Sequence, residues 1–144
     1  MDILFTCFLA WAFAQFIKGF IHLLKKKEWS WNQALASGSF PSAHSSFMTC
    51  LVFQLGAKEG FQSSVFILAL AIWAVVIYDS YNVRYSVGIQ AQLLNKMGQE
   101  LKESMIEDFE PTQEILGHTR FEVAAGICLG LLIALIRLKF FPFA

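Results

Sequence analysis

Two of the three histidines of this chain stand in short polar segments whose side chains could bind and attack a phosphate. Residues 38–45 read Gly-Ser-Phe-Pro-Ser-Ala-His-Ser and include His44, and residues 116–122 read Leu-Gly-His-Thr-Arg-Phe-Glu and include His118. A third segment, 78–84, reads Tyr-Asp-Ser-Tyr-Asn-Val-Arg. One imidazole can attack while another donates a proton, and cations together with helix N-termini hold phosphate oxygens. The three segments therefore predict a phosphate site if the fold brings them together.

The surrounding sequence has the composition of a membrane protein. Of its 144 residues, 56% are hydrophobic and 15% are charged, whereas soluble domains carry about 25% charged residues. The formal net charge is zero and no stripe of basic and aromatic residues is present, so we expect no nucleic acid partner. Composition therefore predicts a multi-pass integral membrane protein. We expect its three cysteines, Cys7, Cys50 and Cys128, to be buried as small apolar residues.

We expect an all-α fold: a single membrane domain with about four transmembrane helices and one amphipathic surface helix. A span needs about 20 mostly apolar residues to cross about 30 Å of hydrocarbon as a helix. The segments that meet or approach this length are residues 3–24, 41–57, 62–78 and 121–138. The second is the shortest, and we expect it to begin near Pro41 with Ser39 as its cap. In 86–110, apolar residues recur at three- and four-residue spacing, which predicts an amphipathic helix on the membrane or against the bundle.

Four spans would place all three polar segments at one membrane face. Lys25 and the two lysines that follow it lie after the first span, and further basic residues precede the last span. The positive-inside rule therefore predicts that the polar face is cytoplasmic and that both termini lie outside, although Arg137 and Lys139 reduce the contrast. Within the last span, Gly126 and Gly130 form a small-residue pair that allows close helix packing. We expect this pair to contribute to a homo-oligomer.

At these polar segments the chain resembles a known family, the divergent branch of the type-2 phosphatidic acid phosphatase and vanadium haloperoxidase superfamily. The resemblance covers nearly the whole chain. It rests on Pro-Ser-Ala-His at 41–44, Tyr-Asp-x-x-x-Val-Arg at 78–84, Gly-x-Gln-Ala-x-x-Leu-Asn at 88–95 and Leu-Gly-His-Thr-x-x-Glu-Val at 116–123. It implies hydrolysis of a phosphate monoester or diphosphate on a membrane lipid. We expect no metal or other cofactor, because lysine and arginine can supply the charge compensation.

The resemblance also implies roles for single residues. His118 would attack the phosphorus and become a phosphohistidine, and Glu122 would orient it. His44 would protonate the leaving oxygen, while Ser42 and neighbouring amides would hold the phosphate. Glu122 also forms a capping-box pattern with Thr119, a structural role that is compatible with orienting the histidine.

The charges that would compensate the phosphate depart from the parent superfamily. Lys18, with Lys25 seven residues on, matches its Lys-x6-Arg pattern loosely, and both are candidate phosphate ligands. Thr112 stands six residues before the second histidine, where the parent pattern has arginine, so we expect Arg84 to replace that charge. Asp79 would pair with one of these cations or, less simply, bind a metal.

Two functions from other classes fit the same residues. A non-catalytic protein that binds lipid head groups or assists membrane assembly could keep the fold without the parent arginine. A small transporter or channel subunit could use Lys18 and Asp79 to line a path across the bilayer, since ionisable residues inside spans are functional by default.

Overall fold

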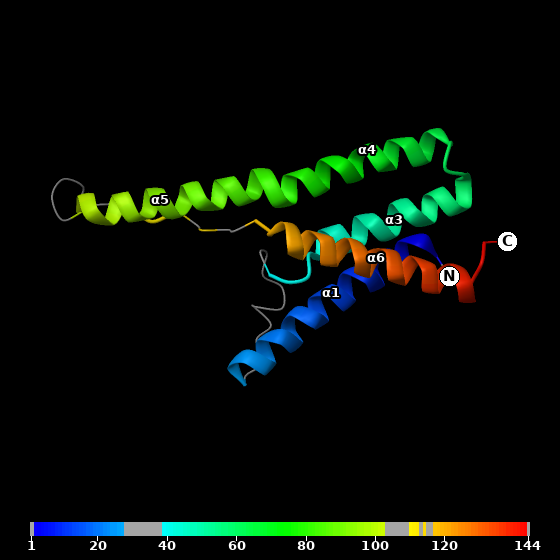
Figure 1. Ribbon diagram of the computed structural model, residues 1–144, viewed down its shortest axis with the longest axis horizontal. Coiled ribbons are helices and arrows are strands. Elements are labelled where there is room, and N and C mark those ends of the chain that lie inside the picture. Colours follow the sequence, from blue (N-terminus) through cyan, green and yellow to red (C-terminus); the bar gives the residue numbers. More distant parts are fainter. Residues whose placement is uncertain (1, 28–38, 103–109, 113, 115–116, 144) are drawn as a thin grey trace.

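The computed structural model describes residues 2–27, 39–102, 110–112, 114 and 117–143, and every regular element within them is helical (Figure 1). This confirms the predicted all-α fold. In chain order, the elements are α1 (Ile3–Lys26), α3 (Ala43–Glu59), α4 (Ser64–Tyr78), a π-helical turn (Asp79–Val83), α5 (Arg84–Lys102) and α6 (Arg120–Phe140). Helices α1, α3, α4 and α6 match the four predicted spans to within two residues at each end.

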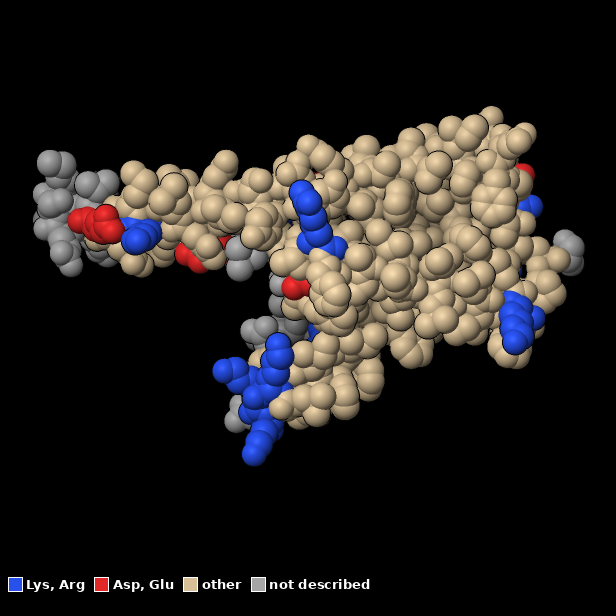
Figure 2. Space-filling view, in the orientation of Figure 1, with Lys and Arg blue, Asp and Glu red and all other residues tan. Residues whose placement is uncertain are grey.

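Within the described part of the chain, three stretches of helix are long and apolar enough to cross a membrane: α1, α6 and the continuous helix Ser64–Glu100. The fourth bundle helix, α3, has 17 residues, which corresponds to about 26 Å at 1.5 Å per residue. It is nevertheless the centre of the bundle, because α1, α4 and α6 all pack against it. Figure 2 shows a broad flank of the bundle without charged residues and basic groups gathered towards its two ends. Length, composition and charge placement therefore all fit a membrane protein.

The start of α3 differs from the prediction. The helix begins at Ala43, and its N-cap is Ser42, whose Oγ accepts a hydrogen bond from the backbone N–H of Ser45 at 3.4 Å. The expected cap at Ser39 is wrong, because that serine lies three residues too early to reach the free amides of the first turn. Pro41 precedes the cap rather than standing in the first turn.

The contact between α3 and α6 depends on two glycines. A Cβ atom added at Gly126 would lie 2.3 Å from the carbonyl oxygen of Ser42, and one added at Gly130 would lie 2.2 Å from that of Ser46. The helix backbones can approach this closely only because both residues lack a side chain. Both glycines are therefore buried inside the chain, and the expectation that they hold a second copy is wrong.

The cysteines divide between the core and the surface. Cys7 and Cys50 are fully buried where α1, α3 and α6 meet, as predicted, and the side-chain nitrogen of Gln54 lies 3.2 Å from the sulfur of Cys50. Cys128 is exposed, so its predicted burial is wrong. It lies on α6 next to Ile127, away from the two glycines that face α3.

Helix α5 continues α4 without a break. No glycine or proline interrupts the chain between Tyr78 and Val87, and the π-helical turn Asp79–Val83 keeps the helix direction, so the two helices form one rod (Figure 1). The predicted amphipathic helix thus starts at Arg84, and it extends past the bundle instead of lying against it. Its predicted end near residue 110 falls next to residues 103–109, outside the described part of the chain.

Candidate functional site

The three polar segments lie at the same end of the bundle. At this end α1 and α4 finish, and α3 and α6 begin (Figure 1). The backbone joins two of the segments directly, since the N–H of Ser42 donates to the carbonyl oxygen of Glu122 at 3.0 Å. The convergence expected from four spans is therefore present in the fold.

The π-helical turn provides the docking point for His118. In an α-helix the carbonyl of Ser80 would accept the N–H of Arg84, but in the π-helical turn that N–H bonds to Asp79 instead. The freed carbonyl oxygen of Ser80 accepts the backbone N–H of His118 at 3.0 Å. The irregular turn thus anchors the histidine to the α4–α5 rod.

Gly117 allows this docking at close range. A Cβ atom on it would lie 2.2 Å from the backbone nitrogen of Tyr85 and 2.7 Å from the carbonyl carbon of Arg84. Backbone atoms cannot move aside as the end of a flexible side chain can, so any larger residue would push the segment off the rod. The glycine of the Leu-Gly-His-Thr pattern therefore has a steric reason, which the sequence alone did not indicate.

His118 is buried beside a carboxylate. Its exposed fraction is 5%, and its Nδ1 lies 3.4 Å from Oε2 of Glu122. The same Oε2 accepts the backbone N–H of Thr119 at 2.9 Å, and the Thr119 hydroxyl accepts the N–H of Glu122 at 3.3 Å. The predicted capping box is thus confirmed, and it holds the carboxylate next to the imidazole. The carboxylate therefore lies on the Nδ1 side of the ring, and Nε2 is the ring nitrogen that does not face it.

The surroundings of His118 favour the neutral imidazole. Burial lowers its pKa below the ordinary value, and the positive charge of Lys18 lowers it further, as does His44. The carboxylate of Glu122 opposes this shift but is the smaller influence. A neutral imidazole has the free lone pair that a nucleophile needs.

The predicted lysines border a cavity on the other side of the α6 N-terminus. Lys18 is 5% exposed although it lies within α1, and it is close enough to Glu122 for the two charges to interact. A cavity of about 250 Å³ is lined by both of these residues together with Lys25, His22, Ile21, Ser39 and Phe40. Lys18 and Lys25 therefore contribute positive charge next to the carboxylate that contacts His118.

His44 and Ser42 have different surroundings. His44 lies in the first turn of α3, as predicted, and is exposed; the charges of Arg84, Lys18 and Asp79 all act on it. Ser42 is fully buried, and its Oγ accepts from the Ser45 hydroxyl at 2.9 Å. Ser42 thus fixes the N-terminus of α3, with its oxygen already engaged.

Arg84 and Asp79 form an ion pair, with Nε of the arginine 2.5 Å from Oδ2 of the aspartate. Both lie at the ends of the π-helical turn, five residues apart, and the arginine side chain is 55% exposed. The predicted structural pairing of Asp79 is therefore found. Arg84 is placed near His44 and not in the cavity that borders His118.

Thr112 is far from the other predicted residues. Its N–H and hydroxyl donate to Oδ1 of Asn95 at 2.8 and 2.9 Å, while Nδ2 of Asn95 donates to the Thr112 carbonyl at 2.8 Å. Asn95 is ten residues beyond Tyr85, the contact of Gly117, which is about 15 Å along α5. An arginine at position 112 would lie beside α5, away from the cavity that borders His118.

Arg120 and Tyr81 border the histidine, and sequence reasoning missed them. A cavity of about 290 Å³ is lined by His118, Thr119, Arg120, Tyr81, Asn82 and Tyr85. The guanidinium of Arg120 lies 5.9 Å from the centre of the Tyr81 ring, within the range of a cation–π contact. The sequence could have indicated Arg120 through its position, because it stands two residues after His118. Among the described residues, no group of three or more His, Cys, Asp or Glu side chains is arranged to hold a metal ion.

Comparison with known proteins agrees with this arrangement. The model of the divergent PAP2 family matches residues 1–133. The chain is also similar to the uncharacterized membrane protein YuiD of Bacillus subtilis (strain 168), with 29% identity over 140 residues that cover 90% of this chain and 89% of that protein. No solved structure matches the chain. The family match covers α1, α3, α4, both histidine segments and most of α6, and the chain belongs to the divergent PAP2 family.

Proposed function

We propose that this protein hydrolyses a phosphate monoester or diphosphate on a membrane lipid, with His118 as the nucleophile. The observation that carries the proposal is the buried imidazole of His118 with a carboxylate 3.4 Å from Nδ1 and a cavity of about 290 Å³ beside it. A nucleophile oriented by a neighbouring acid next to an open site is the usual arrangement for covalent catalysis. Membership of the divergent PAP2 family supports the same reaction class.

In the first step, Nε2 of His118 attacks the phosphorus while the bond to the lipid oxygen breaks. The electron pair of that bond goes to the leaving oxygen, which takes a proton from the imidazolium of His44. Glu122 holds the Nδ1–H and stabilises the positive charge that develops on the ring. The products of this step are a dephosphorylated lipid and a phosphohistidine.

In the second step, water attacks the phosphohistidine. The now neutral imidazole of His44 takes a proton from the water, and the N–P electron pair returns to Nε2 of His118. Inorganic phosphate leaves and His44 regains the proton that it gave up. Each residue thus ends in the state in which it began, as turnover requires.

Charge compensation would come from lysine and arginine. Lys18 is close enough to His118 for its charge to act on the imidazole, and Arg84 acts in the same way on His44. Preorganised cations in a site with little water stabilise the transition-state charge strongly. Lys25 and Asp79 would adjust this field, and Ser42 would support it by fixing the start of α3.

A second candidate is lipid head-group binding without turnover. The specific observation in its favour is Thr112, which stands where the parent superfamily has arginine and is hydrogen-bonded to Asn95 on α5. If Lys18 and Arg84 do not replace that charge, the site would bind a phosphate without cleaving it.

Phosphate release separates the two candidates. We expect purified protein in detergent micelles to release phosphate from at least one of phosphatidic acid, phosphatidylglycerol phosphate and a polyprenyl diphosphate. His118→Ala should lower the rate by about 10³-fold or more, because the attacking group is lost. Gln92→Ala, on the exposed face of α5, is the control and should retain the wild-type rate. Equal rates for wild type and His118→Ala on every substrate would overturn the hydrolase proposal.

A further inference from the structure

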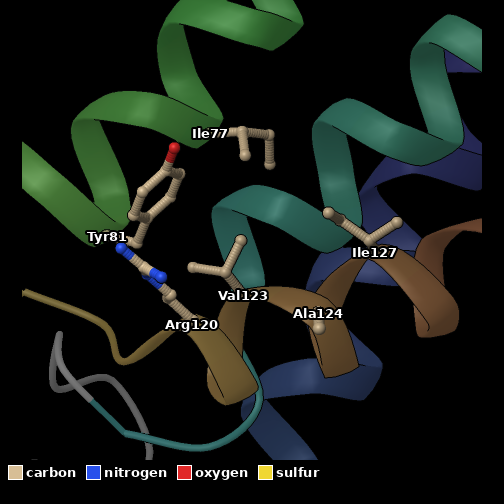
Figure 3. A pocket seen from close by; sticks show the side chains of 6 residues that line it. All are labelled: Ile77, Tyr81, Arg120, Val123, Ala124 and Ile127. Carbon is tan, nitrogen blue, oxygen red and sulfur yellow. The ribbon is translucent and has the colours of Figure 1, made fainter.

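A second cavity adjoins the site along the flank of the bundle. It has a volume of about 420 Å³ and lies between α4 and α6, lined by Ile77, Tyr81, Arg120, Val123, Ala124 and Ile127 (Figure 3). It exists because α3 packs against both α4 and α6, while α4 and α6 make few contacts with each other. We refer to this cavity as the α4–α6 crevice.

The α4–α6 crevice is apolar along its walls and cationic at one end. Figure 3 shows Ile77 on one wall and Val123 and Ile127 on the other, with the Arg120 side chain reaching towards Tyr81. Arg120 is the first residue of α6, whereas Ile77 and Ile127 lie within helices that can span a membrane. The crevice therefore runs from hydrocarbon depth to the polar end of the bundle.

Arg120 and Tyr81 belong to two cavities at once. Both line the α4–α6 crevice and also the cavity beside His118. A molecule in the crevice would therefore have its apolar part between Ile77 and Ile127 and its polar end between Arg120 and His118. The chemistry that matches these two ends is a hydrocarbon chain that carries an anionic phosphate.

We propose that the α4–α6 crevice holds a hydrocarbon chain of the lipid phosphate and that Arg120 anchors its head group beside His118. This inference rests on the proposed function for its substrate class, but it assigns a chain-binding surface and a head-group residue that the reaction itself does not require. It makes Arg120 a binding residue and Tyr81 the support on which its guanidinium rests. It also makes the open flank of α6 the route from the bilayer to the site.

Filling the crevice tests the chain-binding surface. Ala124 is exposed on the crevice wall, so Ala124→Phe should fill the space without entering the contact with α3. We expect kcat/KM for a long-chain phosphatidic acid in mixed micelles to fall at least tenfold, and that for water-soluble phenyl phosphate to change less than twofold. Ala12→Phe, on an exposed position of α1, is the matched control and should leave both values unchanged. Equal effects on both substrates, or none, would overturn the chain-binding surface.

Photochemical labelling tests the same inference without turnover. A phosphatidic acid with a diazirine in its acyl chain should label the peptides that contain Ile77 and Val123, in wild type and in His118→Ala alike. Ala124→Phe should abolish this labelling, and Arg120→Gln should reduce it at least fivefold. If His118→Ala is still labelled but the wild type releases no phosphate from any substrate, the hydrolase proposal is rejected. The proposal that the crevice binds the hydrocarbon chain is then retained.

A probe without phosphate tests the head-group anchor. A diazirine-labelled diacylglycerol should label the crevice at least fivefold less than the phosphatidic acid probe does. Equal labelling by both probes, unaffected by Arg120→Gln, would show that the crevice takes bilayer lipid in general, and it would overturn the role of Arg120.

Discussion

Helix α6 faces α3 on one side and α4 on another, and these two sides differ in how closely they pack. On the side of α3, Gly126 and Gly130 bring backbone against backbone, and the Cβ positions lie within 2.3 Å of carbonyl oxygens. On the side of α4, the walls stand apart and enclose a crevice of about 420 Å³. The closed side fixes the position of the Glu122 segment relative to α3, and the open side leaves His118 and Arg120 reachable. One helix thus combines a rigid site with lateral access.

The largest expected effect breaks the closed side. Gly126→Leu should prevent α3 and α6 from packing, because the added side chain meets the Ser42 carbonyl and cannot displace a backbone. Overpacking of a tight core costs about 1–3 kcal/mol and occasionally more. We expect little folded protein by size-exclusion chromatography in detergent.

Ala124→Leu on the open side is the matched control for this experiment. It places a leucine two residues earlier on α6, where the side chain enters the crevice and does not meet α3. Folded Gly126→Leu protein with wild-type thermal stability would contradict the contrast between the two sides.

The next effect concerns the docking of His118. Gly117→Ala should push its segment off the rod, because the new Cβ would lie 2.2 Å from the Tyr85 nitrogen. A misplacement of about 1 Å can cost about 10²-fold in rate. We therefore expect kcat for phosphate release to fall by about that factor while the protein stays folded. A wild-type rate in Gly117→Ala would show that the π-helical turn does not position the histidine.

Glu122→Gln separates capping from orientation. A glutamine can still accept the N–H of Thr119, so the helix should lose at most about 1 kcal/mol of stability. The amide cannot stabilise a positive imidazole as a carboxylate does, and we expect kcat to fall about 10–100-fold. Thermal unfolding and phosphate release, measured on the same preparation, report the two roles. A loss of stability without a change in kcat would show that Glu122 caps the helix and does not orient His118 for catalysis.

The smallest effect is a displaced pH profile. Burial and then Lys18 lower the pKa of His118, so the neutral imidazole should persist below pH 6.5. On the acidic side of the profile, activity should fall as the pH drops through that lowered pKa, because His118 becomes protonated. Lys18→Met removes a charge that lowers the pKa, so the acidic limb of kcat/KM should move to higher pH. A limb that stays in place, or moves to lower pH, would contradict this electrostatic contact.

The sequence was sufficient for the bundle because its spans are long apolar runs with clear ends. The capping box of Thr119 and Glu122 was also predictable, since it depends on residues three apart. The cap of α3 was misplaced, because Ser39 and Ser42 carry the same local signal and only the packed helix distinguishes them. Helix caps were thus predictable where only one nearby residue could form the capping hydrogen bond.

Features that depend on long-range packing were not predictable. The π-helical turn frees the Ser80 carbonyl only because one extra residue is accommodated between Asp79 and Arg84. No local sequence motif indicates this extra residue. Arg120 was only one of the basic residues that precede the last span, although it borders His118, because the direction of its side chain depends on how α6 faces α4. The glycines of α6 gave the correct kind of contact and the wrong partner, since small residues do not specify which helix they meet.

The most direct test of the account is to trap the phosphorylated residue. Protein mixed with ³²P-labelled lipid phosphate and quenched in alkali within milliseconds should carry one acid-labile, base-stable label, which peptide mapping assigns to residue 118. The label should be absent from His118→Ala and should accumulate in His44→Ala, if the latter slows hydrolysis of the intermediate more than its formation. A label on any other residue, or turnover by wild type with no label at any time point, would contradict the assignment of His118 as the nucleophile.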